Sequence, residues 1–222
     1  MPTLKFFGHA CFLLSHENTA ILFDPFLTDN PYGKAKPEEI SCNYILVSHA
    51  HFDHLGDAVA IAKRTGATVV STAEVARLCG DQGCKAEAMH IGGKRKFDFG
   101  HIRITLAFHG AGVPGGHACG FAVNFFGKTV YHAGDTGLFG DMELIGRLES
   151  IDYALLPIGG NFTMGPEDAV EAVGLLKPRT VIPMHYGTWP VIEQSPEAFK
   201  AAVETRYSVP VRIVRPGEAI EL

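Results

Sequence analysis

Three histidines and an aspartate crowd into six residues, at His49, His51, Asp53 and His54. They follow directly after the apolar run Tyr44–Val47, which predicts a short buried strand. Imidazoles are costly to bury without partners, and they repel one another when protonated. The pattern H-x-H-x-D-H therefore favours a fold that gathers these side chains around a cation. We expect it in a loop at the carboxyl end of a sheet strand, where open α/β sheets bind ligands.

Composition sets the class of protein. The chain has 222 residues, 46% of them hydrophobic, and we expect one domain over residues 1–222. A net charge of −5 without a basic run disfavours nucleic acid as a partner. We expect a cytoplasmic protein, because we find neither a signal peptide nor the roughly 20 apolar residues of a membrane span. The five cysteines are interpreted as free thiols, with a disulfide between Cys79 and Cys84 as the less favoured alternative.

Apolar periodicity predicts strands first and strand–helix alternation afterwards. The expected strands are Leu4–Phe7, Cys11–Ser15, Ala20–Phe23, Tyr44–Val47, Ala67–Val70, Lys96–Phe99, Ile102–Phe108, Gly120–Phe126, Thr129–His132, Tyr153–Leu156, Thr180–Ile182, Val211–Val214 and Ala219–Leu222. The expected helices begin at or just after Asp57, Thr72, Asp141, Gly165 and Ser195. The order of elements roughly repeats after about residue 95, so we predict an α/β fold of two mixed sheets packed face to face, with helices outside.

Three later residues of ligand type also end predicted strands. They are His109, Asp135 and His185. With the first cluster they make seven candidates, enough for two metal ions with three or four protein ligands each. Imidazole and carboxylate together suit zinc, iron, nickel and manganese, and histidine-rich sets favour zinc. The alternative, a group of polar loop histidines held by local hydrogen bonds, does not explain candidates at four separate strand ends.

These motifs resemble the metallo-β-lactamase superfamily. "HAHFDH" is followed in order by His109, by Asp135 in "GDT" and by His185 in "PMHYG". Other stretches, such as "GHACFLL" and "LPIGGNFTMGPEDAV", resemble a subfamily of small bacterial metal-dependent hydrolases. That subfamily is similar to L-ascorbate-6-phosphate lactonases and, more distantly, to phospholipase D enzymes acting on N-acyl-ethanolamine phospholipids. The resemblance covers nearly the whole chain.

The resemblance implies an αββα four-layer sandwich that holds two divalent metal ions. His49, His51 and His109 would hold one ion, Asp53, His54 and His185 the other, and Asp135 both. It implies a hydrolase that uses a metal-bridging hydroxide on an ester, lactone or phosphodiester of a small molecule or lipid. Asp53 and Asp135 are the expected catalytic residues. Zinc is expected first, with manganese, iron or nickel as alternatives.

Two other functions stay open on the same fold. One is an iron-based redox protein, although such proteins usually carry glutamate at the position of His51 and add a flavin domain. The other is a nuclease or cyclic-nucleotide phosphodiesterase, which the acidic balance disfavours. The sequence specifies neither the substrate nor the native metal. It leaves the oligomeric state open as well, and a homo-oligomer is one alternative.

Other polar residues each carry two interpretations. Asp24 either orients a metal-bound imidazole or is a turn aspartate before a proline, and His9 either faces the cleft or lies in an exposed turn. Asn161 and Thr163, in the 157–165 loop, either contact substrate or cap the following helix. His117 is interpreted as a flexible-loop residue, and His16, His90 and His101 as partnerless surface residues. The G-x-G-x-x-G match at 110–115 is not interpreted as a nucleotide site, because no helix follows it.

Overall fold

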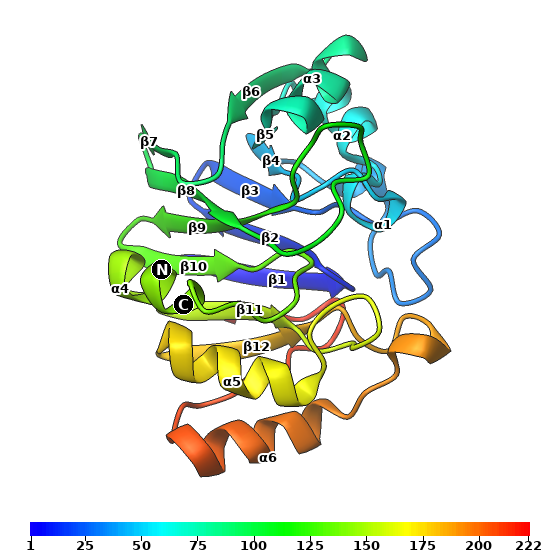
Figure 1. Ribbon diagram of the computed structural model, residues 1–222. Coiled ribbons are helices and arrows are strands. Elements are labelled where there is room, and N and C mark those ends of the chain that lie inside the picture. The colour runs from blue at the N-terminus through cyan, green and yellow to red at the C-terminus, as the bar shows by residue number, and fades with distance from the viewer.

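The computed structural model describes residues 1–222 as two mixed β-sheets packed face to face between layers of helices (Figure 1). The strand order is β13-β1-β2-β3-β4-β5-β6 in the first sheet and β12-β11-β10-β9-β8-β7 in the second. The first sheet comprises β1 (Thr3–Gly8), β2 (Cys11–His16), β3 (Thr19–Phe23), β4 (Tyr44–Leu46), β5 (Thr68–Thr72), β6 (Lys85–Met89) and β13 (Ala219–Glu221). The predicted four-layer α/β sandwich is confirmed.

The second sheet and the helices complete the layers. The sheet comprises β7 (Lys94–Phe97), β8 (Gly100–Leu106), β9 (Cys119–Phe125), β10 (Lys128–His132), β11 (Tyr153–Pro157) and β12 (Thr180–Met184). The α-helices are α1 (Phe52–Leu55), α2 (Ala58–Thr65), α3 (Ala73–Asp81), α4 (Met142–Glu149), α5 (Pro166–Leu176) and α6 (Pro196–Tyr207), with 3₁₀ turns at Pro37–Glu39 and Pro190–Ile192. Helices α2 and α3 cover the first sheet, and α4 to α6 the second (Figure 1).

Side-chain alternation divides the core into two layers. In β3, Ile21 and Phe23 point into the main core of 41 buried residues between the sheets. Leu22, between them, points to the opposite face and packs in a second core of 15 residues under α2 and α3. Each such side chain contributes about 1.5–3 kcal/mol to the free energy of folding when it is fully buried. A strand with both faces covered reads as a continuous apolar run, which explains "AILF".

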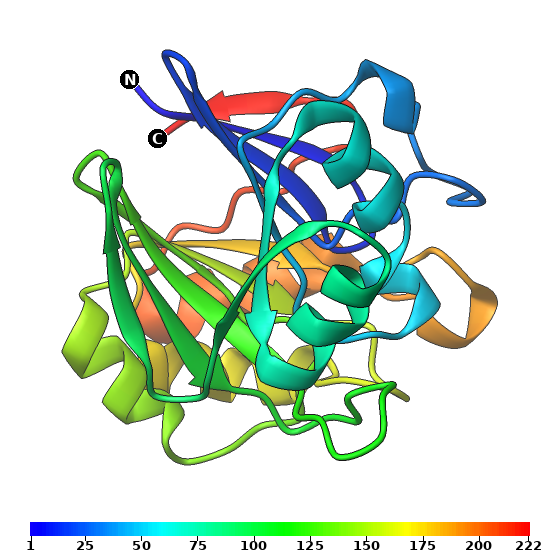
Figure 2. The ribbon, with the colours of Figure 1, turned by 90° about the horizontal axis from the view of Figure 1, so that it is seen from above.

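Parallel directions bring several strand ends to one edge of the sandwich. Strands β3, β4 and β5 are mutually parallel, as are β10, β11 and β12. β1 and β3 are both antiparallel to β2, and β8 and β10 both to β9, so each pair runs in one direction. At the far end of the chain, β13 pairs with β1, and the two termini lie side by side (Figure 2).

Four local predictions were wrong or incomplete. Val211–Val214 forms a single bridge to Val181 rather than a strand, because Pro210 and Pro216 flank it and cannot donate to a ladder. β6 was not expected, since Lys85–Met89 is an exposed edge strand without an apolar face. The motif loop contains one helical turn, α1, in which Leu55 N–H donates to the His51 carbonyl. Asp57 begins α2 as predicted, but its carboxylate accepts from Thr28 N–H and Oγ instead of capping the helix.

The cysteines and the helices settle two further points. All five cysteines are free thiols, and four of them are buried, so the disulfide alternative is wrong. None of the helices combines the length and the apolar character that a membrane-spanning helix needs.

Candidate metal centre

The ligand-type side chains lie at the edge where the parallel strands end. Asp24 follows β3, and the H-x-H-x-D-H motif follows β4. His109, Asp135 and His185 follow β8, β10 and β12, respectively. His9, Asp24 and His185 have φ angles of 59°, 38° and 54°, in the left-handed region that side chains rarely adopt. Such strain persists where the surrounding structure enforces it, and it concentrates at functional sites.

Three histidines form the first half of the centre. His49 Nε2 lies 2.9 Å from His51 Nδ1, which lies 3.3 Å from His109 Nε2. Their ligand atoms all lie within 4.8 Å of one another, so one ion could contact all three. This is the set that the resemblance implies for one ion.

Asp53, His54 and His185 form the second half. His54 Nε2 lies 3.6 Å and His185 Nε2 3.7 Å from Asp53 Oδ2. Asp135 lies between the halves: Oδ1 is 3.2 Å from His54 Nε2, and Oδ2 is 3.1 Å from His185 Nε2 and 3.6 Å from His109 Nε2. One carboxylate therefore contacts imidazoles of both predicted ligand sets.

Unpartnered polar atoms show that these residues fit divalent metals. His54 Nε2, Asp135 Oδ1 and both ring nitrogens of His185 are buried and accept or donate no hydrogen bond. Buried polar groups normally have partners, because an unsatisfied one costs about 1–3 kcal/mol. A cation contacting these nitrogens and oxygens would remove that cost. Imidazole and carboxylate are also the donors that zinc and similar divalent ions take.

Asp24 and Ser48 fix the imidazole tautomers. Asp24 is fully buried; its Oδ2 accepts from His54 Nδ1 at 2.7 Å and from Ser48 Oγ at 2.7 Å. Ser48 Oγ in turn accepts from His49 Nδ1 at 2.9 Å. Both Nδ1 atoms are thereby protonated, which leaves Nε2 of His49 and of His54 as the ring nitrogen that a cation in the cleft could bind. Such outer hydrogen bonds characteristically orient metal-binding histidines.

The carboxylates set the charge of the cluster. Burial alone would raise the pKa of Asp135, but the charges of His185 and His54, whose Nε2 atoms lie 3.1 and 3.2 Å from its carboxylate oxygens, hold that pKa well below its usual range. Burial would lower the pKa of His185, yet Asp135 and Asp53 raise it to about 9. Burial lowers the pKa of His49 well below its usual range, with the neighbouring His54 charge adding to the effect. The centre thus favours positive charge beside its carboxylates and a neutral His49.

His9 lies inside the cleft and not in an exposed turn. It is 2% exposed; its Nε2 donates to Asp53 Oδ2 at 3.0 Å, and its Nδ1 accepts from Thr188 Oγ1 at 2.8 Å. Burial, followed by the His185 charge, lowers the pKa of His9 to about 4, so the ring is neutral near pH 7. A neutral imidazole with one fixed tautomer can hold the Asp53 carboxylate in one orientation.

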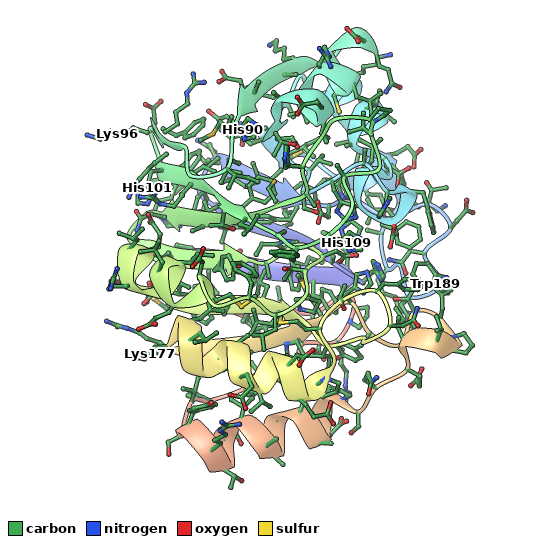
Figure 3. The ribbon with its side chains drawn as sticks, viewed as in Figure 1. His90, Lys96, His101, His109, Lys177 and Trp189 are labelled. Carbon is green, nitrogen blue, oxygen red and sulfur yellow. The ribbon has the colours of Figure 1, made fainter.

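A cavity of about 430 Å³ opens over the centre. His51, Asp53, His109, Asp135 and His185 form its floor. Its walls are the apolar side chains of Phe52, Phe162, Trp189 and Val191. No lysine or arginine lines it. His109 and Trp189 lie at one end of the sandwich, whereas Lys96, His101 and Lys177 lie at the other (Figure 3).

A glycine loop packs closely against the backbone of the motif beside His51. Gly112 has φ 68°, and a Cβ there would lie 2.7 Å from the Ala50 carbonyl carbon and 2.8 Å from His51 N. Ala111 also accepts from Ala50 N–H at 2.8 Å. The G-x-G-x-x-G match therefore marks a close backbone approach to Ala50 and to the candidate ligand His51.

Some predicted residues stay outside the centre, and some members were missed. Asn161 is exposed, and Thr163 Oγ1 donates to the Met164 carbonyl, so neither lines the cavity. His117 is exposed and also lies outside. Trp189 and Thr188 were not anticipated, since a loop residue's direction is not encoded in local periodicity. Ser48 was also missed. Its hydroxyl, immediately before the motif, could have been recognised from the sequence as a partner for a neighbouring imidazole.

Comparison with known proteins gives consistent matches. Residues 3–185 match the family described as "Beta-lactamase superfamily domain". The chain is 58% identical over 227 residues to a UPF0173 metal-dependent hydrolase of Pelotomaculum thermopropionicum, covering 99% of both chains. It is 52% identical over 219 residues to one of Natranaerobius thermophilus, again covering 99% of both. The solved structure of Igni18, a metallo hydrolase of Ignicoccus hospitalis, superposes with a TM-score of 0.93 at 39% identity, covering 100% of this chain and 99% of that one.

Proposed function

The chain belongs to the metallo-β-lactamase superfamily and is a metal-dependent hydrolase, and from this premise we propose that it holds two divalent cations and cleaves an uncharged ester or lactone. The observation that carries the proposal is Asp135, whose carboxylate lies between the His49–His51–His109 set and the Asp53–His54–His185 set. Each set would hold one ion. Asp135 would contact both and offset part of their mutual repulsion. Zinc is our first candidate from the donor types, with manganese, iron or nickel as alternatives.

The cations would supply Lewis acidity and an activated water for attack on the scissile carbonyl. The chain's own residues would orient that chemistry. His9 donates to Asp53 at 3.0 Å and so holds one carboxylate oxygen in a fixed direction at the cleft floor. Asp53, itself a member of the second set, is then placed to accept a proton from the attacking water and return it to the leaving group.

The walls of the cavity favour an uncharged substrate with an apolar group. Phe52, Phe162 and Val191 are 68%, 52% and 54% exposed, which is costly unless they contact something apolar. A phosphodiester or nucleotide would bring negative charge to walls that offer no lysine or arginine. An ester or lactone would bring only its carbonyl to the floor. We call the four apolar lining residues, Phe52, Phe162, Trp189 and Val191, the apolar collar. The collar favours our proposal over the nuclease and phosphodiesterase alternatives.

Metal removal and reconstitution test the proposal. Protein stripped with a chelator and reloaded with zinc or manganese is assayed on p-nitrophenyl esters, lactones and bis-p-nitrophenyl phosphate. We expect metal-dependent turnover of esters or lactones, and a loss of about 100-fold or more in Asp135→Asn. Asp141→Asn, at the start of α4 and away from the cavity, is the control. Turnover of the phosphodiester alone would overturn the substrate class, and no metal-dependent hydrolysis of any probe would count against the function itself.

A matched pair of variants tests the collar. Phe162→Ala removes a cavity wall, whereas Phe126→Ala removes an exposed phenylalanine, 42% accessible, that lies outside the cavity. We expect Phe162→Ala to raise KM more for longer acyl chains than for acetate, since it removes apolar contact area. Equal effects on all chain lengths would contradict a role for Phe162 in substrate binding.

A further inference from the structure

A second group of metal-ligand side chains lies outside the cavity. Glu74 of α3, His90 after β6 and His117 of the loop between β8 and β9 offer ligand atoms within 4.8 Å of one another. None of the three lines the cavity. His90 lies toward the β6 side of the molecule, away from Trp189 (Figure 3). His90 was expected to be a partnerless surface residue and His117 a flexible-loop residue, but their ring centroids lie 5.6 Å apart, with the ring planes tilted by 54°.

Each member of this group has at least one potential metal-ligand atom that makes no hydrogen bond. Glu74 Oε2 is buried and has no hydrogen-bond partner. His90 Nδ1 accepts from Ile91 N–H at 2.8 Å, which leaves Nε2 for another contact. Neither His117 ring nitrogen has a hydrogen-bond partner in the protein, although its backbone carbonyl accepts from Thr72 Oγ1 at 3.0 Å. Two imidazoles and a carboxylate converge here without bonding to one another.

We propose that Glu74, His90 and His117 form a third, peripheral site for a divalent cation, with zinc as its preferred ion. Two histidines and one glutamate are a known zinc donor set. His90 and His117 are exposed, so water can complete the coordination on the outer side. The cation would give the buried Glu74 oxygen the partner that it lacks. This site does not depend on the proposed function of the cavity.

The consequence would be a cross-link between three chain segments. His117 lies near the end of the loop between β8 and β9, and the same loop carries His109 of the cavity lining and Gly112, which packs against His51. In Figure 1 this green loop rises from β8 towards α3. A cation between His117, His90 and Glu74 would tie the far end of the loop to α3 and β6. The near end, which carries His109 of the cavity lining, would then lose freedom to move outward.

The test counts zinc ions per chain. Full-length protein is saturated with zinc and passed through a desalting column, and bound zinc is measured by plasma mass spectrometry. We expect His90→Ala and His117→Ala each to lose about one ion relative to wild type, and the double variant to lose no more than either single one. The control is His16→Ala, a partly exposed histidine beside Glu17 and outside every cluster. Because His90 and His117 are exposed, neither change disturbs the core.

A second readout follows the loop itself. Zinc should slow proteolysis within residues 107–118 in wild type and in His16→Ala, but less in His90→Ala. An unchanged zinc count in both single variants would overturn the third site. So would loss of the ion in the His16→Ala control to the same extent, since that would show nonspecific surface binding.

Discussion

Replacing Asp24 by asparagine should weaken metal binding without unfolding the protein. Asparagine tolerates the left-handed φ of 38° at this position better than most residues. Its amide has one oxygen and one NH₂ group where aspartate has two acceptors. If the NH₂ faced the Ser48 backbone N–H, which now donates to Oδ1 at 2.7 Å, two donors would meet in a buried place. The oxygen is therefore expected to stay there.

The NH₂ group must then face His54 Nδ1. That nitrogen now donates to Asp24 Oδ2 at 2.7 Å, and it can only accept from an amide if its proton moves to Nε2. His54 Nε2 is the atom that faces Asp135 and Asp53, so the proton would occupy the ligand position. Loss of such an orienting partner costs about 10–100-fold in metal affinity. At about 1.4 kcal/mol per factor of ten, this is roughly 1.4–2.8 kcal/mol for one of the two proposed ions.

Asp57→Asn is a matched control, because Asp57 also accepts three hydrogen bonds. They come from Leu27 N–H, Thr28 N–H and Thr28 Oγ1, none of which belongs to the metal centre. Zinc titration calorimetry gives the affinities, and long-range ¹H–¹⁵N NMR correlations on the metal-free protein give the His54 tautomer. Against the effect of burial, Asp135 and Asp24 raise the pKa of His54 well above its ordinary value, so its Nε2 also carries a proton in the metal-free wild type. We therefore expect weaker zinc binding and loss of the His54 Nδ1 proton in Asp24→Asn only. An unchanged tautomer with zinc affinity within threefold of wild type would refute the reasoning.

Three further predictions concern stability. Chelation should lower the melting temperature, because ions at 1,000 times their Kd stabilise by about 4 kcal/mol, or roughly 8–16 °C for a chain of this length; identical melting with and without metal would contradict a shared site. Glu149, which accepts from His101, Arg103 and Lys94, has its pKa held low by these contacts against the effect of burial, so its contribution is present above the ordinary glutamate pKa of about 4.3 and lost as pH falls through the folded pKa. Glu149→Gln should therefore destabilise at pH 7 and less at pH 3 in denaturant titrations, and an equal loss at both would oppose this. Gly112→Ala should destabilise by about 1–3 kcal/mol more than Gly115→Ala, which has a similar φ of 73° but open space around its Cβ; equal melting temperatures would show that the contact with Ala50 can relax.

The sequence predicted the architecture because its strands have two-sided burial. Ile21, Leu22 and Phe23 show this as a continuous apolar run. The strands at the edges of the sheets were harder to predict from the sequence. β6, with the sequence "KAEAM", has no apolar face, and it forms because β5 offers unpaired backbone groups beside it. Val211 to Val214 has a strand-like composition, but only tertiary context shows that flanking prolines limit it to one bridge.

The metal-ligand candidates could be identified from sequence because each directly follows an apolar strand. Parallel strands end at one edge, so the sequence alone predicted that His109, Asp135 and His185 lie near the first cluster. His9 was harder to place, since burial of a turn residue depends on Thr188, which is 179 positions away. The apolar collar was not predicted, because an exposed apolar side chain such as Phe162, in a loop, has no periodic signal. The Glu74–His90–His117 group was missed because three chain segments without a shared motif create it.

Anomalous diffraction at the zinc absorption edge, from crystals grown with zinc, tests the central claim most directly. It locates ions independently of activity and of any binding elsewhere on the chain. We predict two strong peaks on either side of Asp135, one contacting His49, His51 and His109, and the other contacting Asp53, His54 and His185. A single peak in the cavity, or two peaks of which neither contacts Asp135, would contradict the two-ion centre.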